Sequence, residues 1–156
     1  MGSLALLIDR ILQGVCALLM IGLAAMVIIA VTLRTIGQSP LWYDEVAAIW
    51  LVWLTFFAAA LVTLRRAHLG FDAALKAMPP LIRGFCFVGG EMIALAFYAA
   101  VAFYGWRVLG IIAGETLVSL PWLGYEIVQS VIPVSAAIML VGQLLSAPLA
   151  WRRLSA

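Results

Sequence analysis

Three long stretches of this chain contain no charged residue, and their lengths decide its class. They cover residues 11–33, 46–64 and 127–151, which is 23, 19 and 25 residues. A fourth apolar stretch, residues 84–106, contains a single charged residue, Glu91. A helix needs about 20 mostly apolar residues to cross the hydrocarbon core of a bilayer. The sequence therefore predicts an all-α integral membrane protein, built as a bundle of four transmembrane helices.

The composition supports a single membrane domain. Apolar residues make up 67% of the 156 residues and charged residues 10%, whereas a soluble domain has roughly 45–50% and about 25%. Because four spans use most of the length, we expect residues 1–156 to form one domain. The first apolar stretch is longer than the roughly 7–15 residues of a signal-peptide core, so we expect it to be retained. The net charge of +2 gives no indication of nucleic-acid binding.

The basic residues predict the orientation of the chain in the membrane. If the chain crosses four times, seven Lys and Arg residues fall on the side of the termini, and only Arg34 and Arg107 fall on the other side. Cytoplasmic loops carry an excess of Lys and Arg. We therefore expect both termini in the cytoplasm.

The connection between the second and third spans, residues 65–83, is the most water-compatible part of the sequence. Its apolar residues Phe71, Leu75 and Met78 recur at helical spacing, and a proline pair follows at residues 79–80. A short helix with one apolar face lies in the membrane interface, and proline ends it. The pattern predicts a short amphipathic interfacial helix on the cytoplasmic side.

Residue types that carry catalysis or bind metals are scarce. His68 is the only histidine, and Cys16 and Cys86 belong to no C-x-x-C pair. One histidine cannot supply two axial haem ligands or a histidine-rich metal site. We expect no catalytic, metal or cofactor-binding residues, and no enzyme activity.

Glu91 is the only ionisable residue deep within a predicted span, and such residues are functional candidates by default. Gln143 in the fourth span lies at a similar depth from the same side. Three interpretations remain open for Glu91. It bonds Gln143 and joins two spans, it faces a polar group of a partner subunit, or it couples a proton or ion to transport.

Aromatic residues follow one face of the second span. Trp50, Trp53 and Phe57 recur at helical spacing below the interfacial belt, so interfacial anchoring does not account for them. They either pack against lipid and neighbouring helices or form a surface for another membrane protein. The charged residues at the two ends of this span are helix caps and orientation signals, or ion-pair partners of another subunit. These candidate interface residues are Asp44, Glu45, Arg65 and His68.

The order and spacing of one set of residues resemble a known family. These residues are Trp42, Tyr43, Asp44, Glu45, Trp50, Trp53, Phe56, Phe57, Ala58, Ala59, Arg65, His68 and Asp72, followed by residues 119–122, Tyr125 and residues 132–134. Together they resemble the small membrane subunit of tripartite ATP-independent periplasmic (TRAP) transporters, the DctQ-like family. Ala58 stands where relatives often have glycine, and the arginine that often follows the acidic pair is absent.

The resemblance implies a function that the residues alone do not give. Such a subunit scaffolds and orients a large DctM-like transport subunit in the bacterial inner membrane, while a periplasmic DctP-like protein delivers the substrate. Uptake in the family is driven by sodium and usually serves organic acids. The main rival is a self-sufficient four-span exporter that works as a homodimer with Glu91 as its coupling residue. A structural protein of another membrane complex is a further alternative.

Overall fold

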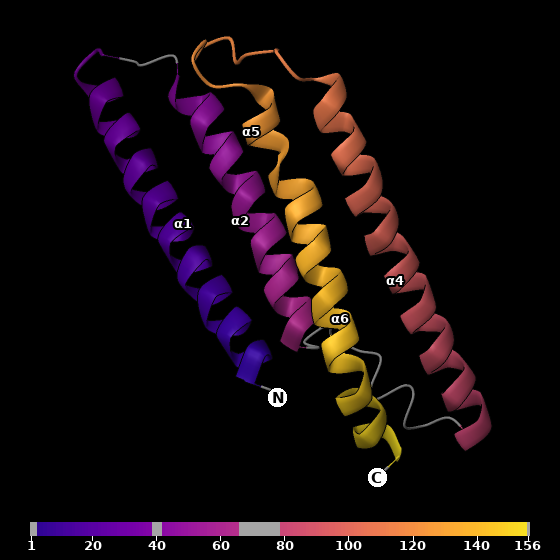
Figure 1. Ribbon diagram of the computed structural model, residues 1–156. Helices are drawn as coiled ribbons and strands as arrows, with labels where there is room; N and C mark the ends of the chain where they lie inside the picture. The colour runs from indigo at the N-terminus through magenta and orange to yellow at the C-terminus, as the bar shows by residue number, and fades with distance from the viewer. Residues whose placement is uncertain (1–2, 39–41, 66–78, 156) are drawn as a thin grey trace.

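The computed structural model describes residues 3–38, 42–65 and 79–155. Apolar sequence in this part of the chain folds into five helices (Figure 1). They are α1 (Ser3–Thr35), α2 (Tyr43–Arg65), α4 (Pro80–Ile111), α5 (Tyr125–Gln129) and α6 (Val131–Ser155). The predicted amphipathic helix and His68 lie outside the described residues.

The four predicted spans correspond to four helices that are long and apolar enough to cross a membrane. These segments are Ala5–Thr35, Tyr43–Arg65, Ile82–Ile111 and Tyr125–Ala147. The helices extend beyond the uncharged stretches into the flanking residues. Charged residues such as Asp9 and Arg65 therefore lie within the helices. The prediction of an all-α protein with four potential spans is confirmed.

The helices of the predicted bundle lie side by side in a single row. Figure 1 shows the order α1, α2, α6, α4 across the layer. Helix α2 packs on α1 and α6, and α6 packs on α4 as well. The helices are apolar on all sides, so no hydrophobic face drives the row to close. Both broad faces of the layer consequently expose large apolar side chains.

Different segments of the chain lie at the two ends of the layer. The start of α1 and the end of α6 lie at the same end (Figure 1), which we call the termini side. The end of α1, the start of α2 and the connection from α4 to α5 lie at the opposite end, which we call the loop side. This arrangement follows from four antiparallel crossings.

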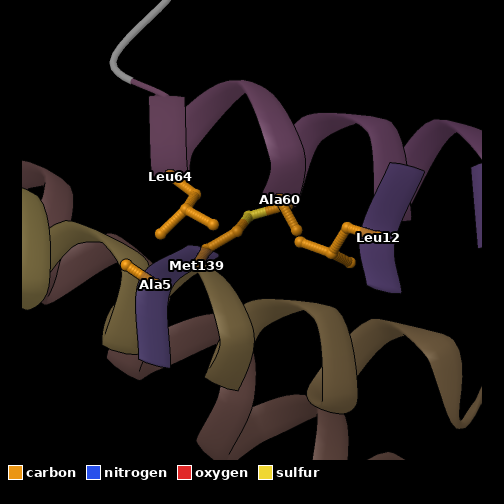
Figure 2. Close-up of a cluster of buried hydrophobic side chains, with 5 residues drawn as sticks. All are labelled: Ala5, Leu12, Ala60, Leu64 and Met139. Atoms are coloured by element: carbon orange, nitrogen blue, oxygen red, sulfur yellow. The ribbon is translucent and has the colours of Figure 1, made fainter. Parts of the chain in front are cut away.

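A small buried cluster joins three helices near the termini side (Figure 2). Ala5 and Leu12 of α1 meet Ala60 and Leu64 of α2, and Met139 of α6 extends between them. Ala60 is fully buried, and its small side chain lets the helix backbones approach closely, as is common where membrane helices pack. The cluster therefore packs α2 against both α1 and α6.

A short hairpin connects α4 to α5 on the loop side. Thr116 and Gly124 form an isolated antiparallel bridge, and the Leu117 amide donates to the Leu123 carbonyl over 3.1 Å. Gly114 has φ +94°, a conformation that glycine adopts without steric cost. Leu117 is almost completely buried. The hairpin is therefore held against the ends of the helices.

Candidate partner interface

The charged residue at the end of α2 forms an ion pair within the chain. Arg65 Nε donates to Asp9 Oδ1 over 2.6 Å, and Arg65 Nη2 donates to Asp9 Oδ2 over 3.0 Å. Gln13, one turn further along α1, donates to the same carboxylate. Paired contacts of this kind fix the orientation of both side chains. The predicted interface residue Arg65 thus joins α1 to α2 on the termini side.

Of the two acidic residues at the start of α2, Glu45 accepts a hydrogen bond and Asp44 is exposed. Glu45 Oε2 accepts a hydrogen bond from the backbone N–H of Ser119 over 2.9 Å. This contact ties the hairpin to α2. Asp44 is exposed in the first turn, where a carboxylate interacts favourably with the helix dipole.

Trp53 makes a polar contact with the broken fourth span. Its indole Nε1–H donates to the Val128 carbonyl of α5 over 2.9 Å. Proline at position 133 has no N–H for the ladder and disfavours a continuous helix, and the chain is indeed divided into α5 and α6. The division falls at Ser130, three residues before Pro133. Because an unsatisfied carbonyl is costly in hydrocarbon, the bond from Trp53 stabilises this break.

Phe57 and Trp50 also contact groups of their own chain. The ring of Phe57 lies edge-on to that of Trp53, with centroids 6.3 Å apart and an angle of 77° between the planes. The ring of Trp50 lies against Gly22 of α1, so closely that a Cβ on Gly22 would stand 2.4 Å from Trp50 Cζ3. All three aromatic side chains are half-buried. The aromatic face therefore contributes to packing between helices and leaves part of each ring exposed.

Of the three interpretations left open for Glu91, the one that bonds it to Gln143 has its hydrogen bond in the structure. Gln143 Nε2 donates to Glu91 Oε2 over 2.9 Å, joining α4 to α6. Gln143 is only 7% exposed and Glu91 is half-buried. A second polar contact, 3.4 Å between the hydroxyls of Thr63 and Tyr98, joins α2 to α4. Both contacts place polar groups between helices of the same chain.

The sequence alone did not indicate several of the residues that make these contacts. Asp9 and Gln13 have helical i, i+4 spacing, which could have indicated a polar face at the start of the first span. The sequence alone does not single out Gly22, because its need to be glycine depends on the position of Trp50. Ser119 takes part through its backbone, so its side chain carries no signal. Within the described ranges, no group of three or more His, Cys, Asp or Glu residues could hold a metal ion.

Four helices of spanning length, with polar groups joined between them, define a multi-pass membrane protein. The model of the DctQ component of tripartite ATP-independent periplasmic transporters matches residues 23–153. The chain belongs to this family, and the resemblance drawn from its residues is confirmed. None of the curated proteins matches the chain. Membership implies a small membrane subunit of a TRAP transporter, which functions with DctM and DctP components.

Proposed function

We propose that the chain is the non-catalytic small subunit of a sodium-driven, binding-protein-dependent transporter for organic acids. It scaffolds and orients the large transport subunit, which is DctM-like. The observation that carries this proposal is the family match over residues 23–153. Sodium coupling and the organic-acid substrate come from the same resemblance.

The single row of helices supports a scaffolding role. A layer one helix thick leaves apolar side chains exposed on both broad faces, so one face is available to a larger membrane protein while the other contacts lipid. Packing of preformed helices is the main source of association in a bilayer. Glu91 and Gln143 bond each other between α4 and α6, which favours a structural role over a place in a transport path.

We propose that both termini are cytoplasmic, so that the loop side faces the periplasm. A periplasmic DctP-like protein would then meet the complex near the hairpin and Asp44. We further propose that the candidate residues of α2 contribute to the large-subunit interface through their exposed surface. For Trp50, Trp53 and Phe57, this is the part of each ring that contacts within the chain leave uncovered.

The test is affinity purification of the tagged chain from the membranes of its host in mild detergent, followed by mass identification of bound proteins. A stoichiometric multi-span partner of much larger mass would support the proposal. Sodium-dependent organic-acid uptake by vesicles containing the complex, and none by either subunit alone, would support the finer assignment. Recovery of the chain only as a dimer of itself would contradict the scaffold and favour the exporter with Glu91.

The contribution of the aromatic face requires its own test. We expect the double substitution Trp50→Ala and Trp53→Ala to weaken retention of the large subunit. Because both residues pack within the chain, the helical content and monodispersity of the variant must be measured alongside retention. Retention at the level of the unsubstituted chain would assign the aromatic face to internal packing and lipid.

A further inference from the structure

The hairpin and α5 are bonded to each other on the loop side, beside the start of α2 (Figure 1). They comprise residues 115–129, which we call the hairpin unit. Within the hairpin, the Leu117 amide donates to the Leu123 carbonyl over 3.1 Å. The Tyr125 amide, at the start of α5, donates to the Glu115 carbonyl over 2.9 Å. These bonds hold the two parts of the unit in one arrangement.

The hairpin unit buries little of its own surface. Of residues 115–129, all of which the structure describes, only Leu117 is buried, with 1% of its surface exposed. Its neighbours Thr116 and Val118 are exposed, as expected for an extended segment whose successive side chains point to opposite faces. A segment with so few buried side chains opens locally at a lower free-energy cost than the helices that it rests on.

Two side chains of α2 hold the hairpin unit, one at each of its parts. Glu45 Oε2 accepts a hydrogen bond from the Ser119 amide of the hairpin over 2.9 Å. Trp53 Nε1 donates to the Val128 carbonyl of α5 over 2.9 Å. The two α2 residues are eight positions apart, which is about 12 Å along the helix axis. Because the unit is internally bonded, movement away from α2 breaks both bonds together.

The backbone offers a pivot on each side of the hairpin unit. Gly114, directly before it, has φ +94°, a conformation that glycine adopts without steric cost. Directly after it, the helix divides at Ser130, and Pro133 has no N–H to bond the Gln129 carbonyl one turn earlier. Hinges are a few loop or element-terminal residues that absorb the backbone rotation. Helices α4 and α6 therefore stay packed while the unit rotates about these positions.

We propose that the hairpin unit leaves and rejoins α2 as one body, and that Glu45 and Trp53 together hold it closed. In the closed state both bonds are made and Leu117 is covered. In the open state both bonds are broken and Leu117 is accessible to solvent. A change at either bond shifts the same equilibrium, so its effect is measurable at the other end of the unit.

This equilibrium links the two surfaces beside the hairpin unit. Its outer surface includes Val118, which is 87% exposed, and Trp122, which is 78% exposed. A protein that binds this surface in one state also changes the bonds to α2, and a protein that contacts α2 beside Trp53 reciprocally changes the hairpin. This linkage rests on the proposed function, in which the binding protein and the large subunit are those two proteins. The opening itself does not.

The test measures access to position 117 in the full-length chain, purified with its bound proteins in mild detergent. The chain carries Leu117→Cys, and Cys16→Ala and Cys86→Ala remove the two native thiols. The rate of reaction with a water-soluble maleimide reports the open state. We expect Trp53→Phe to raise this rate about tenfold, the factor for one lost hydrogen bond, although Val128 lies at the other end of the unit.

Variants at the other bond make the complementary measurement. Glu45→Ala removes the acceptor for the Ser119 amide and should also raise the rate about tenfold. Glu45→Gln keeps an acceptor oxygen and should leave the rate within about twofold of the starting value. Hydrogen exchange at the Ser119 amide repeats the comparison in chains that retain Leu117, and it should be faster after Trp53→Phe.

Two exposed residues provide matched controls. Asp44→Ala removes the neighbouring carboxylate in the same turn of α2. Trp106→Phe makes the same exchange of rings at a side chain of α4 that is 71% exposed. Neither should change the maleimide rate or the exchange at Ser119. Circular dichroism of each variant shows whether the helices remain folded.

Three results would overturn the proposal. A rise after only one of Glu45→Ala and Trp53→Phe would mean that the hairpin and α5 open separately. An equal rise after Asp44→Ala would assign the effect to charge at the start of α2. Unchanged rates in every variant would show that the two bonds do not hold the unit closed. Co-purification of an unrelated partner would contradict the proposed function and leave these rates as they are, so the two proposals fail separately.

Discussion

Asp9 and Arg65 form two hydrogen bonds, of 2.6 and 3.0 Å, although 56 positions separate them in the chain. The carboxylate is the more sheltered partner, with 14% of its side chain exposed against 43% for the arginine. The pair closes the termini side of the contact between α1 and α2, beside the buried cluster of Ala5 and Leu64.

We expect Asp9→Asn and Arg65→Gln each to lower the unfolding temperature of the purified assembly, because each leaves the partner charge without its counterion. The double substitution Asp9→Arg with Arg65→Asp should restore most of the lost thermal stability. It leaves the net charge on the termini side unchanged. Arg10→Gln removes a nearby exposed charge and serves as the control. Equal effects of Arg10→Gln and Arg65→Gln would show that total charge, and not the pair, determines stability.

Trp53→Phe keeps an aromatic ring and removes the donor to the Val128 carbonyl. We expect a loss of about 1–2 kcal/mol in the free energy of unfolding, since a carbonyl in hydrocarbon loses its partner. Thermal unfolding in detergent measures the effect. Trp122→Phe, at a side chain that is 78% exposed, is the matched control and should be neutral. A neutral Trp53→Phe would mean that another group satisfies the carbonyl.

Gly22→Ala should disturb the contact between α1 and α2, because the new Cβ would stand 2.4 Å from the Trp50 ring. Overpacking of this kind typically costs about 1–3 kcal/mol. Gly14→Ala is the control on the same helix, since nothing lies within 4 Å of its Cβ position. The measurement is unfolding by a denaturing detergent. Combining Gly22→Ala with Trp50→Leu should restore part of the loss, and the absence of any rescue would place the strain elsewhere.

Glu91→Gln should leave both assembly and uptake largely intact, because an amide can still hydrogen-bond Gln143. Gln143→Leu should instead cost about 0.6–2 kcal/mol of stability, the range for hydrogen bonds between membrane helices. Uptake by reconstituted vesicles and retention of the large subunit are measured together. Loss of uptake by a Glu91→Gln complex that assembles normally would assign Glu91 a role in ion coupling.

The sequence was sufficient to predict the four spans, because length and lack of charge alone specify them. Equal depth made the bond between Glu91 and Gln143 one of three interpretations of Glu91. The order of the helices could not be predicted. Spans that are apolar on every side carry no signal for which face meets which neighbour. The contact of Trp53 with Val128 depends on that order, as does the requirement for glycine at position 22.

The single row also determines how the chain would respond to the loss of a helix. An edge helix is held from one side, whereas an inner helix joins two neighbours. Removing α1 would leave α2, α6 and α4 in their mutual contacts. Removing the whole fourth span, α5 and α6, would leave α4 and its hairpin attached to α2 mainly through the hydroxyls of Thr63 and Tyr98 and the bond from Ser119 to Glu45. The edge helix α1 is therefore dispensable for the cohesion of the remaining helices, whereas the fourth span is not.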